Sequence, residues 1–233
     1  MKIYLIRHGE SIYNKNGILQ GHIDIPLSDK GREQAIKTAD RLKHDIKKNE
    51  LKVVAVYSSD LKRATQTAQK TIDILKDDGL DFPIHYRENL REILLGVWEG
   101  KTKNQLYSEK EKDGVSLFEK WIKNPESIVP EGAEAISNFY DRAIKALSEI
   151  IFAYKENVPD GKSAIIVFAH GGVLSMILNY IYGKDPANFV RFAFPNARGF
   201  VVEYEGETGE INESLRGNYR SNLINNIRGW WNV

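Results

Sequence analysis

Three apolar runs along the chain have the pattern of buried β-strands. They are residues 3–6, 53–58 and 163–169, and each is rich in β-branched, aromatic or small apolar side chains. A shorter run at 82–86 contains Pro83, which cannot donate a backbone hydrogen bond, so we expect this strand at the edge of a sheet. The four runs together predict one sheet with a well-buried centre.

Apolar residues between these runs recur at helical spacing. One helix is predicted from its N-cap Ser28 to about Lys48, and another follows Arg63. A long helix is predicted to open at 130–134, and a shorter one covers 173–181. Strands that alternate with helices predict an α/β fold, a three-layer α/β/α sandwich with a mostly parallel central sheet.

The remaining segments are less regular. Residues 101–130 mix charged side chains with isolated aromatic ones, and we expect short helices in an insertion that covers a site. The whole chain, 1–233, is then expected to form a single domain. Residues 192–196 and 199–204 suggest one or two more strands, and 210–215 are a candidate partner for the last of them.

Polar clusters follow the predicted strands directly. Arg7 and His8 follow the first strand, Arg63 lies just after the second, Glu92 follows the edge strand and His170 follows the fourth. Parallel strands place their carboxyl ends at the same edge of a sheet, where ligands bind in open α/β folds. These five residues are therefore predicted to meet, although they are far apart in the sequence.

Two of these residues have a second interpretation. Arg63 lies in the first turn of a helix, where the dipole disfavours a cation, which is a mild indication of a bound anion. It could instead pair with Asp60. A carboxyl group beside apolar residues, as at Glu92, can act as a general acid, but it can also be a salt-bridged surface residue. His22 and His44 are expected at the surface.

The composition narrows the classes of function. A formal charge of +1 from 33 basic and 32 acidic residues gives no electrostatic argument for nucleic acid or for an anionic membrane. The absence of cysteine excludes disulfides, thiolate zinc sites and cysteine nucleophiles. With no leader pattern and no apolar run long enough to span a bilayer, we expect a cytoplasmic protein without a membrane partner.

Two classes of enzyme fit the pattern poorly. A metal hydrolase built on His8 and His170 is disfavoured, because neither has a second ligand at helical spacing and no Asp-rich motif accompanies them. A dinucleotide-binding fold is disfavoured because no Gly-x-Gly-x-x-Gly motif follows the first strand. We therefore expect neither a metal nor a cofactor.

Taken together, the polar clusters resemble the signature of the histidine phosphatase superfamily, also called the phosphoglycerate mutase-like family. Several blocks occur in the family's order, which makes the resemblance specific although each block alone is weak. The matching blocks are Arg7-His8-Gly9-Glu10-Ser11 with Asn14, residues 20–28, 58–64 and 90–100, Pro130 with Gly132 and Glu134, and Ala169-His170-Gly171-Gly172.

The resemblance implies a role for each site residue. His8 would accept the phosphoryl group and form a phosphohistidine, and Glu92 would protonate the leaving oxygen. Arg7, Arg63 and His170 would hold the phosphoryl oxygens, which agrees with the need to neutralise charge in phosphoryl transfer. The substrate would be a small phosphorylated metabolite, bound by a monomer or a homodimer. Further substrate-binding residues would be Asn14, Gln20, Gly21 and Gly171.

The choice within the family favours a phosphatase. The mutases carry a paired arginine after the acid block, whereas the only arginine between Glu92 and His170 is Arg142. Gln20 also stands where the mutases usually have a small hydroxyl residue. The chain resembles the broad-specificity and α-ribazole phosphatases. A 2,3-bisphosphoglycerate-dependent mutase and a non-catalytic phosphate-binding module remain alternatives, although the presence of His8 and Glu92 argues against the second.

Apolar residues beside Glu92 give a hypothesis about the substrate. Leu94, Leu95, Val97 and Trp98 could favour a substrate with an apolar or aromatic part. A purely structural role for the same residues is an equally good interpretation.

Overall fold

The central sheet of the computed structural model has six strands in the order β3-β2-β4-β1-β5-β6. The structure describes residues 1–77, 79–154, 162–187, 194–204 and 228–229. The strands are β1 (Lys2–Arg7), β2 (Lys52–Ser59), β3 (Ile84–Arg87), β4 (Ser163–Ala169), β5 (Gly199–Glu203) and β6 (Arg228–Gly229). The first four are parallel, and β5 runs antiparallel to β1. The mostly parallel sheet and the edge position of β3 are confirmed.

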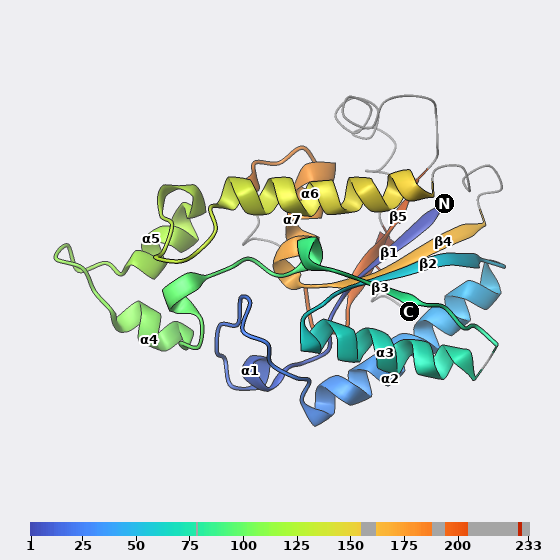
Figure 1. Cartoon of the computed structure of the whole chain (residues 1–233). Coiled ribbons are helices and arrows are strands. Elements are labelled where there is room, and N and C mark those ends of the chain that lie inside the picture. The colour runs from blue at the N-terminus through green and yellow to red at the C-terminus, as the bar shows by residue number, and fades with distance from the viewer. Residues whose placement is uncertain (78, 155–161, 188–193, 205–227, 230–233) are drawn as a thin grey trace.

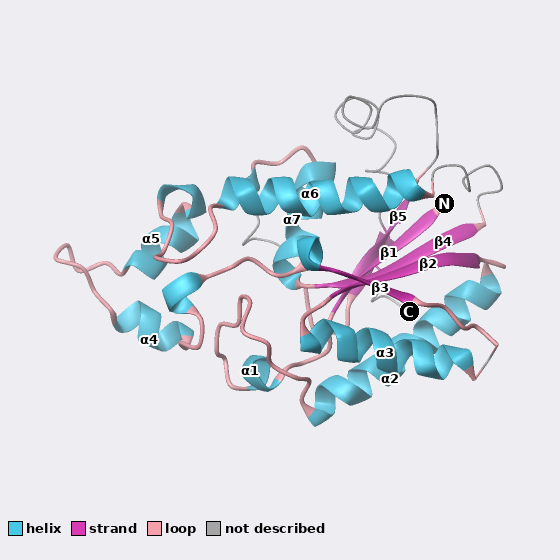
Figure 2. Cartoon of the chain, in the orientation of Figure 1, coloured by secondary structure: helices cyan, strands magenta, loops and turns pink. Residues whose placement is uncertain are grey.

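Helices cover both faces of the sheet (Figures 1 and 2). The α-helices are α1 (Ile12–Lys15), α2 (Asp29–Lys48), α3 (Lys62–Lys76), α4 (Lys103–Ser108), α5 (Leu117–Lys123), α6 (Ile136–Ala153) and α7 (Gly171–Ile181). Helices α2 and α3 lie below the sheet in Figure 1, and α6 and α7 lie above it. The three-layer α/β/α sandwich is therefore confirmed. No helix in the described ranges is long and apolar enough to cross a membrane.

Alternation along the strands fills two cores. Ile3 and Leu5 of β1 pack toward α6 and α7, and Tyr4 and Ile6 pack toward α2 and α3. Because both faces of the strand are buried, the sequence is a continuous apolar run rather than an alternating one. Ser28 caps α2 as predicted, since its hydroxyl oxygen accepts a hydrogen bond from the Gly31 amide at 3.1 Å.

The long helix predicted to open at 130–134 begins later, at Ile136. Gly132 has φ +71°, and Ala133 forms an isolated bridge with Leu95. These residues therefore pair with the segment after Glu92 instead of starting the helix. The prediction was wrong because the Pro-Glu-Gly pattern of a helix start is also the pattern of a tight turn.

The C-terminal predictions are resolved in part. One strand, β5, covers most of 199–204, whereas the described part of 192–196 forms no strand. Residues 210–215 lie outside the described residues.

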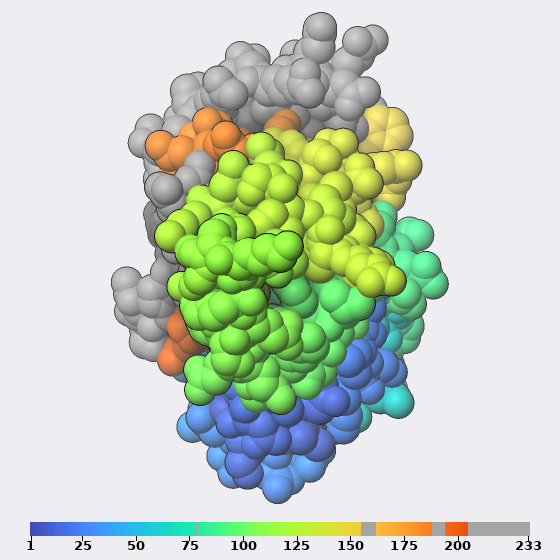
Figure 3. Space-filling view, turned by 90° about the vertical axis from the view of Figure 1, so that its left-hand side faces the viewer, coloured from blue at the N-terminus to red at the C-terminus, as the bar shows by residue number. Residues whose placement is uncertain are grey.

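Beyond the carboxyl ends of the parallel strands lie α4 and α5, at the left of Figure 1. In Figure 3 this light green segment forms the front of the molecule, between N-terminal residues in blue and α6 in yellow.

Candidate active site

Strand pairing brings two histidines together at the carboxyl edge of the sheet. Arg7 at the end of β1 pairs with Ala169 at the end of β4. The next residue of each strand is a histidine, and the rings of His8 and His170 lie 5.1 Å apart between centroids. The meeting of these residues therefore follows directly from the parallel register.

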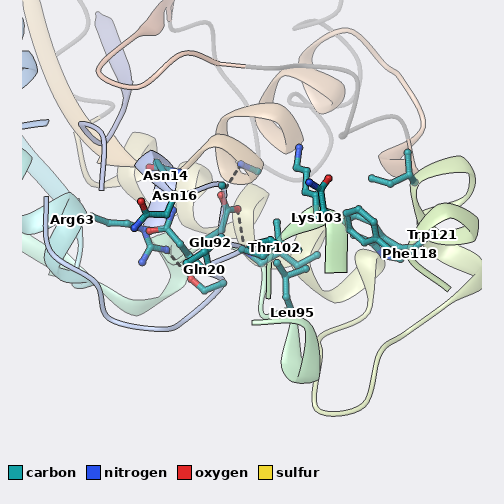
Figure 4. Close-up of a pocket in the computed structure, with 18 of the residues that line it drawn as sticks. Asn14, Asn16, Gln20, Arg63, Glu92, Leu95, Thr102, Lys103, Phe118 and Trp121 are labelled. Carbon is teal, nitrogen blue, oxygen red and sulfur yellow. Dashed lines mark hydrogen bonds between the residues drawn. The ribbon is translucent and has the colours of Figure 1, made fainter. Parts of the chain in front are cut away.

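A pocket of about 710 Å³ opens at this edge (Figure 4). Figure 4 shows Arg63, Gln20 and Asn14 at one end, Phe118 and Trp121 at the other, and Glu92 and Leu95 between them. Its wall includes seven of the nine residues predicted for the site, namely Arg7, His8, Asn14, Gln20, Gly21, Arg63 and Glu92. The other two, His170 and Gly171, lie beside the wall rather than in it.

The ring of His8 is held in one tautomer. Its Nδ1 lies 2.6 Å from the carbonyl oxygen of Gly9, which can only accept, so Nδ1 carries the proton and Nε2 keeps its lone pair. The side chain is buried, and burial, with the charges of Arg63 and Arg7, holds the pKa of His8 well below its usual value. The imidazole is therefore neutral and can act as a nucleophile.

Arg63 is almost completely buried, with 1% of its surface exposed. Its guanidinium donates to the carbonyl oxygens of Ile23 at 2.9 Å and Gly21 at 2.7 Å. Burial lowers its pKa to about 10, although Glu92 opposes the shift, so the group remains a cation near neutral pH. The alternative pairing with Asp60 is wrong, because that carboxylate is bound by Arg91.

Three buried nitrogen atoms of the site have no hydrogen-bond partner among the residues that the structure describes. They are Nε of Arg7, Nε of Arg63 and Nδ1 of His170. The other ring nitrogen of His170 lies 2.9 Å from the Ser59 hydroxyl. Burial and the charge of Arg63 keep the pKa of His170 well below its usual value. Buried polar groups are normally paired, so these three atoms are candidates for binding an anion.

The N-terminus of α7 adds to this anion-binding character. His170 is its N-cap, and the Gly171 and Gly172 that follow start an eleven-residue helix at the edge of the site. The helix dipole favours negative charge at this end. Within the described ranges, no group of three or more His, Asp or Glu side chains is arranged to hold a metal ion.

The carboxylate of Glu92 is held by two backbone amides, one adjacent in the sequence and one from α7. Its carboxylate accepts from the Ile93 amide at 3.0 Å and from the Gly172 amide at 3.1 Å, which ties it to α7. Its carbonyl oxygen lies 2.7 Å from Nε2 of His22 and 3.2 Å from a guanidinium nitrogen of Arg142. His22 is half-buried and holds the acid segment, whereas the sequence placed it at the surface.

Two amide side chains, those of Asn14 and Gln20, lie at the same end of the pocket as Arg63 (Figure 4). The Ser11 hydroxyl lies 2.6 Å from Oε1 of Gln20, and Oδ1 of Asn14 accepts from the Ser11 amide and from Nδ2 of Asn196, each at 3.1 Å. Because both carboxamide oxygens are occupied, each side chain can offer its NH₂ group to a ligand. Asn196 had no predicted role.

Glu99 is the largest omission of the sequence-based prediction. Its Oε1 accepts from the amides of His22 at 2.9 Å and Leu95 at 3.0 Å, and its Oε2 accepts from Ile23 at 3.1 Å. This carboxylate fixes the turn whose carbonyls bind Arg63. Gly21 is required there, because it has φ +49° and a Cβ atom would lie 1.8 Å from Oε1 of Glu99. Glu99 was part of a family block, but nothing in the sequence showed its partners.

Only part of the apolar segment after Glu92 lies at the pocket. Leu95 lines the pocket, but Val97 is 49% exposed and is not in its wall. Trp98 is buried and packs edge-on against Phe118 and Trp121, with ring centroids 5.4 and 5.6 Å apart. The aromatic wall of the pocket therefore comes from α5, and Trp98 supports it from behind.

The two buried histidines predict a loss of stability in acid. In the unfolded chain both bind protons below about pH 6.5, whereas the folded protein keeps them neutral because their pKa values are lowered. The unfolded state therefore binds more protons, and the free energy of unfolding falls as the pH drops, by up to about 1.4 kcal/mol per pH unit for each histidine.

Urea unfolding between about pH 7.5 and pH 5.5 measures this dependence. We expect H8N to reduce the pH dependence of the free energy of unfolding by about the contribution of one histidine. H44N is the matched control, since His44 is exposed, and it should leave the slope unchanged. An H8N slope equal to that of the wild type would contradict the prediction.

Comparison with known proteins finds phosphatases and a mutase among the similar chains. The chain is 31% identical to the putative phosphoserine phosphatase 2 of Hydrogenobacter thermophilus, with 90% of this chain and 93% of that protein aligned. It is 28% identical to the 2,3-bisphosphoglycerate-dependent phosphoglycerate mutase of Hamiltonella defensa, with 93% and 92% aligned. A phosphoserine phosphatase from Entamoeba histolytica, solved with 3-phosphoglyceric acid, superimposes with a TM-score of 0.66 at 27% identity, with 86% and 89% covered.

These likenesses agree with the phosphoglycerate mutase-like fold expected from the sequence and include both phosphatases and a mutase. A family model matches residues 3–215, a range that contains His8, Arg63, Glu92 and His170. That model describes the histidine phosphatase superfamily (branch 1), and this chain belongs to it.

Proposed function

We propose that this protein hydrolyses small phosphate monoesters through a phosphohistidine on Nε2 of His8. The observation that carries the proposal is the tautomer of His8. Its Nδ1–H is committed to the Gly9 carbonyl, so the lone pair of Nε2 is free beside two buried guanidinium groups. The phosphatase relatives support the reaction class.

In the first step, Nε2 of His8 attacks phosphorus and forms the N–P bond while the bond to the leaving oxygen breaks. Glu92 gives its proton to that oxygen, and the alcohol departs. The unpaired donors of Arg7, Arg63 and His170 stabilise the equatorial oxygens, where the charge is concentrated.

In the second step, water attacks phosphorus and the N–P bond breaks. Glu92, now a carboxylate, takes a proton from that water, and Nε2 of His8 recovers its lone pair. The products are the alcohol and inorganic phosphate, and Glu92 ends protonated, as it began. The hydrogen bonds from Ile93 and Gly172 hold the carboxylate in place for both transfers.

The position of Arg142 supports hydrolysis over mutase activity. A mutase must hold the carboxylate of a phosphoglycerate while the phosphoryl group moves. The guanidinium of Arg142 is already committed, because it binds Glu134 at 2.5 Å and the carbonyl oxygens of Arg91 and Glu92. It is therefore not free to grip a substrate carboxylate.

The experiment that tests the proposal traps the intermediate. We would mix the protein with ³²P-labelled phosphate monoesters, with chelator present, and quench in alkali, where a phosphohistidine survives. We expect label on the wild-type protein and none on H8N, with inorganic phosphate as the product. If the label instead passes to 3-phosphoglycerate, and only when 2,3-bisphosphoglycerate is added, the protein is a mutase. Phosphate release without labelled protein would overturn the phosphohistidine mechanism.

A further inference from the structure

A second cavity, of about 290 Å³, lies between α2 and the turn at 195–198. It shares no lining residue with the active-site pocket. Three cationic side chains of α2 line it, namely Lys30, Lys37 and Arg41. Lys37 and Arg41 follow Lys30 by seven and eleven residues, a spacing that places all three along one face of the helix. Arg198 closes the opposite side.

The cavity is lined by more cationic side chains than carboxylates. Lys30 is paired with Glu10 at 3.0 Å, and Glu33 also lines the wall. In the described part of the chain, neither Arg41 nor Arg198 forms an ion pair. In addition, Nη1 of Arg198 is buried and has no hydrogen-bond partner among the same residues. Burial, and then the charge of Arg198, lowers the pKa of Arg41, so the two guanidinium groups repel each other.

An anion bound between Arg41 and Arg198 would neutralise their repulsion and accept hydrogen bonds from both guanidinium groups. It would pair with both guanidinium forks, whose geometry matches carboxylate and phosphate oxygens. Gln34 can add a further donor, because its Oε1 already accepts from the Glu10 amide at 2.7 Å and its NH₂ group remains. The cavity is at the small end of ligand pockets, so a large organic ligand does not fit.

We propose that Arg41 and Arg198 form a second anion-binding site, separate from the active site, for a small phosphate- or carboxylate-bearing ligand. The site adjoins residues 8–14, the segment that carries His8 and Asn14. Asn196, in its wall, donates to Asn14 at 3.1 Å, and the Ala197 amide donates to the His8 carbonyl at 3.0 Å.

Backbone amide NMR during a titration with sodium sulfate tests the proposal, with the ionic strength held constant by sodium chloride. The amides of Gln34, Lys37 and Arg41 report on this cavity, and that of Gly172 reports on the active site. We expect saturable shifts at the α2 amides and a loss of affinity of about tenfold or more in R198Q. A linear, non-saturating shift at these amides would overturn the proposal.

Matched variants separate a built site from a general basic surface. Arg32 is also on α2, is exposed and lies outside the cavity, so R32Q should bind sulfate like the wild type. R41Q repeats the test at the other arginine, in case R198Q disturbs the turn at 195–198 and its hydrogen bonds to His8 and Asn14. Equal binding by R41Q, R198Q and the wild type would overturn the site. Hydrolysis of p-nitrophenyl phosphate by each variant shows independently whether the active site is intact.

Discussion

Replacing Glu92 by glutamine is expected to slow phosphoryl transfer to His8 by about 100-fold or more, because an amide cannot protonate the leaving oxygen. The loss should be largest with alkyl phosphates, whose leaving oxygen is strongly basic. It should be much smaller with p-nitrophenyl phosphate, whose leaving group departs without full protonation. Rapid-quench, single-turnover measurements of the labelled protein give the rate of this step for both substrates.

The matched control is E88Q. Glu88 precedes Glu92 on the same segment, but its carboxylate is 80% exposed and contacts only Arg91 among the ion pairs of the described residues. We expect E88Q to react at the wild-type rate. An equal loss with both substrates in E92Q would contradict the role as proton donor. It would indicate that Glu92 acts only by holding Ile93 and Gly172 in place.

The meeting of His8 and His170 was predictable because it depends on strand register alone. Each follows a buried parallel strand, and adjacent parallel strands deliver the next residue to the same edge. Arg63 was predictable for a similar reason, since it opens the helix after β2. The apolar runs also defined the sheet, because both faces of its central strands are covered by helices.

Partners across loops could not be predicted in the same way. Glu99 binds backbone amides at residues 22, 23 and 95. Every non-proline residue has such an amide, so the sequence does not show which ones a side chain binds. Arg142 had no partner predicted from the sequence, but it binds the carbonyl oxygens of Arg91 and Glu92. The turn around Gly132 was mistaken for a helix start because its pairing with Leu95 is a tertiary contact. Local patterns do not encode such contacts.

Gly172 provides a test of how tightly the proton donor must be placed. A Cβ atom at this position would lie 2.1 Å from Oε1 of Glu92 and 3.1 Å from Cζ of Phe139. The carboxylate is the end of a flexible side chain, so G172A should displace it without unfolding the protein. Because a misplacement of about 1 Å can cost 100-fold, we expect kcat/KM to fall by about that factor while Tm changes little.

Gly171 is the matched control on the same helix turn. A Cβ atom there would meet Nε of Arg7 at 3.5 Å, an ordinary contact. We expect the kcat/KM of G171A to stay within about threefold of the wild type, because the added methyl group makes only an ordinary contact and does not meet the Glu92 carboxylate. If G172A acts through Glu92, adding it to E92Q should cause no further loss, because the two changes remove the same interaction. Additive losses in the double variant would show instead that Gly172 contributes through its own contact with the substrate.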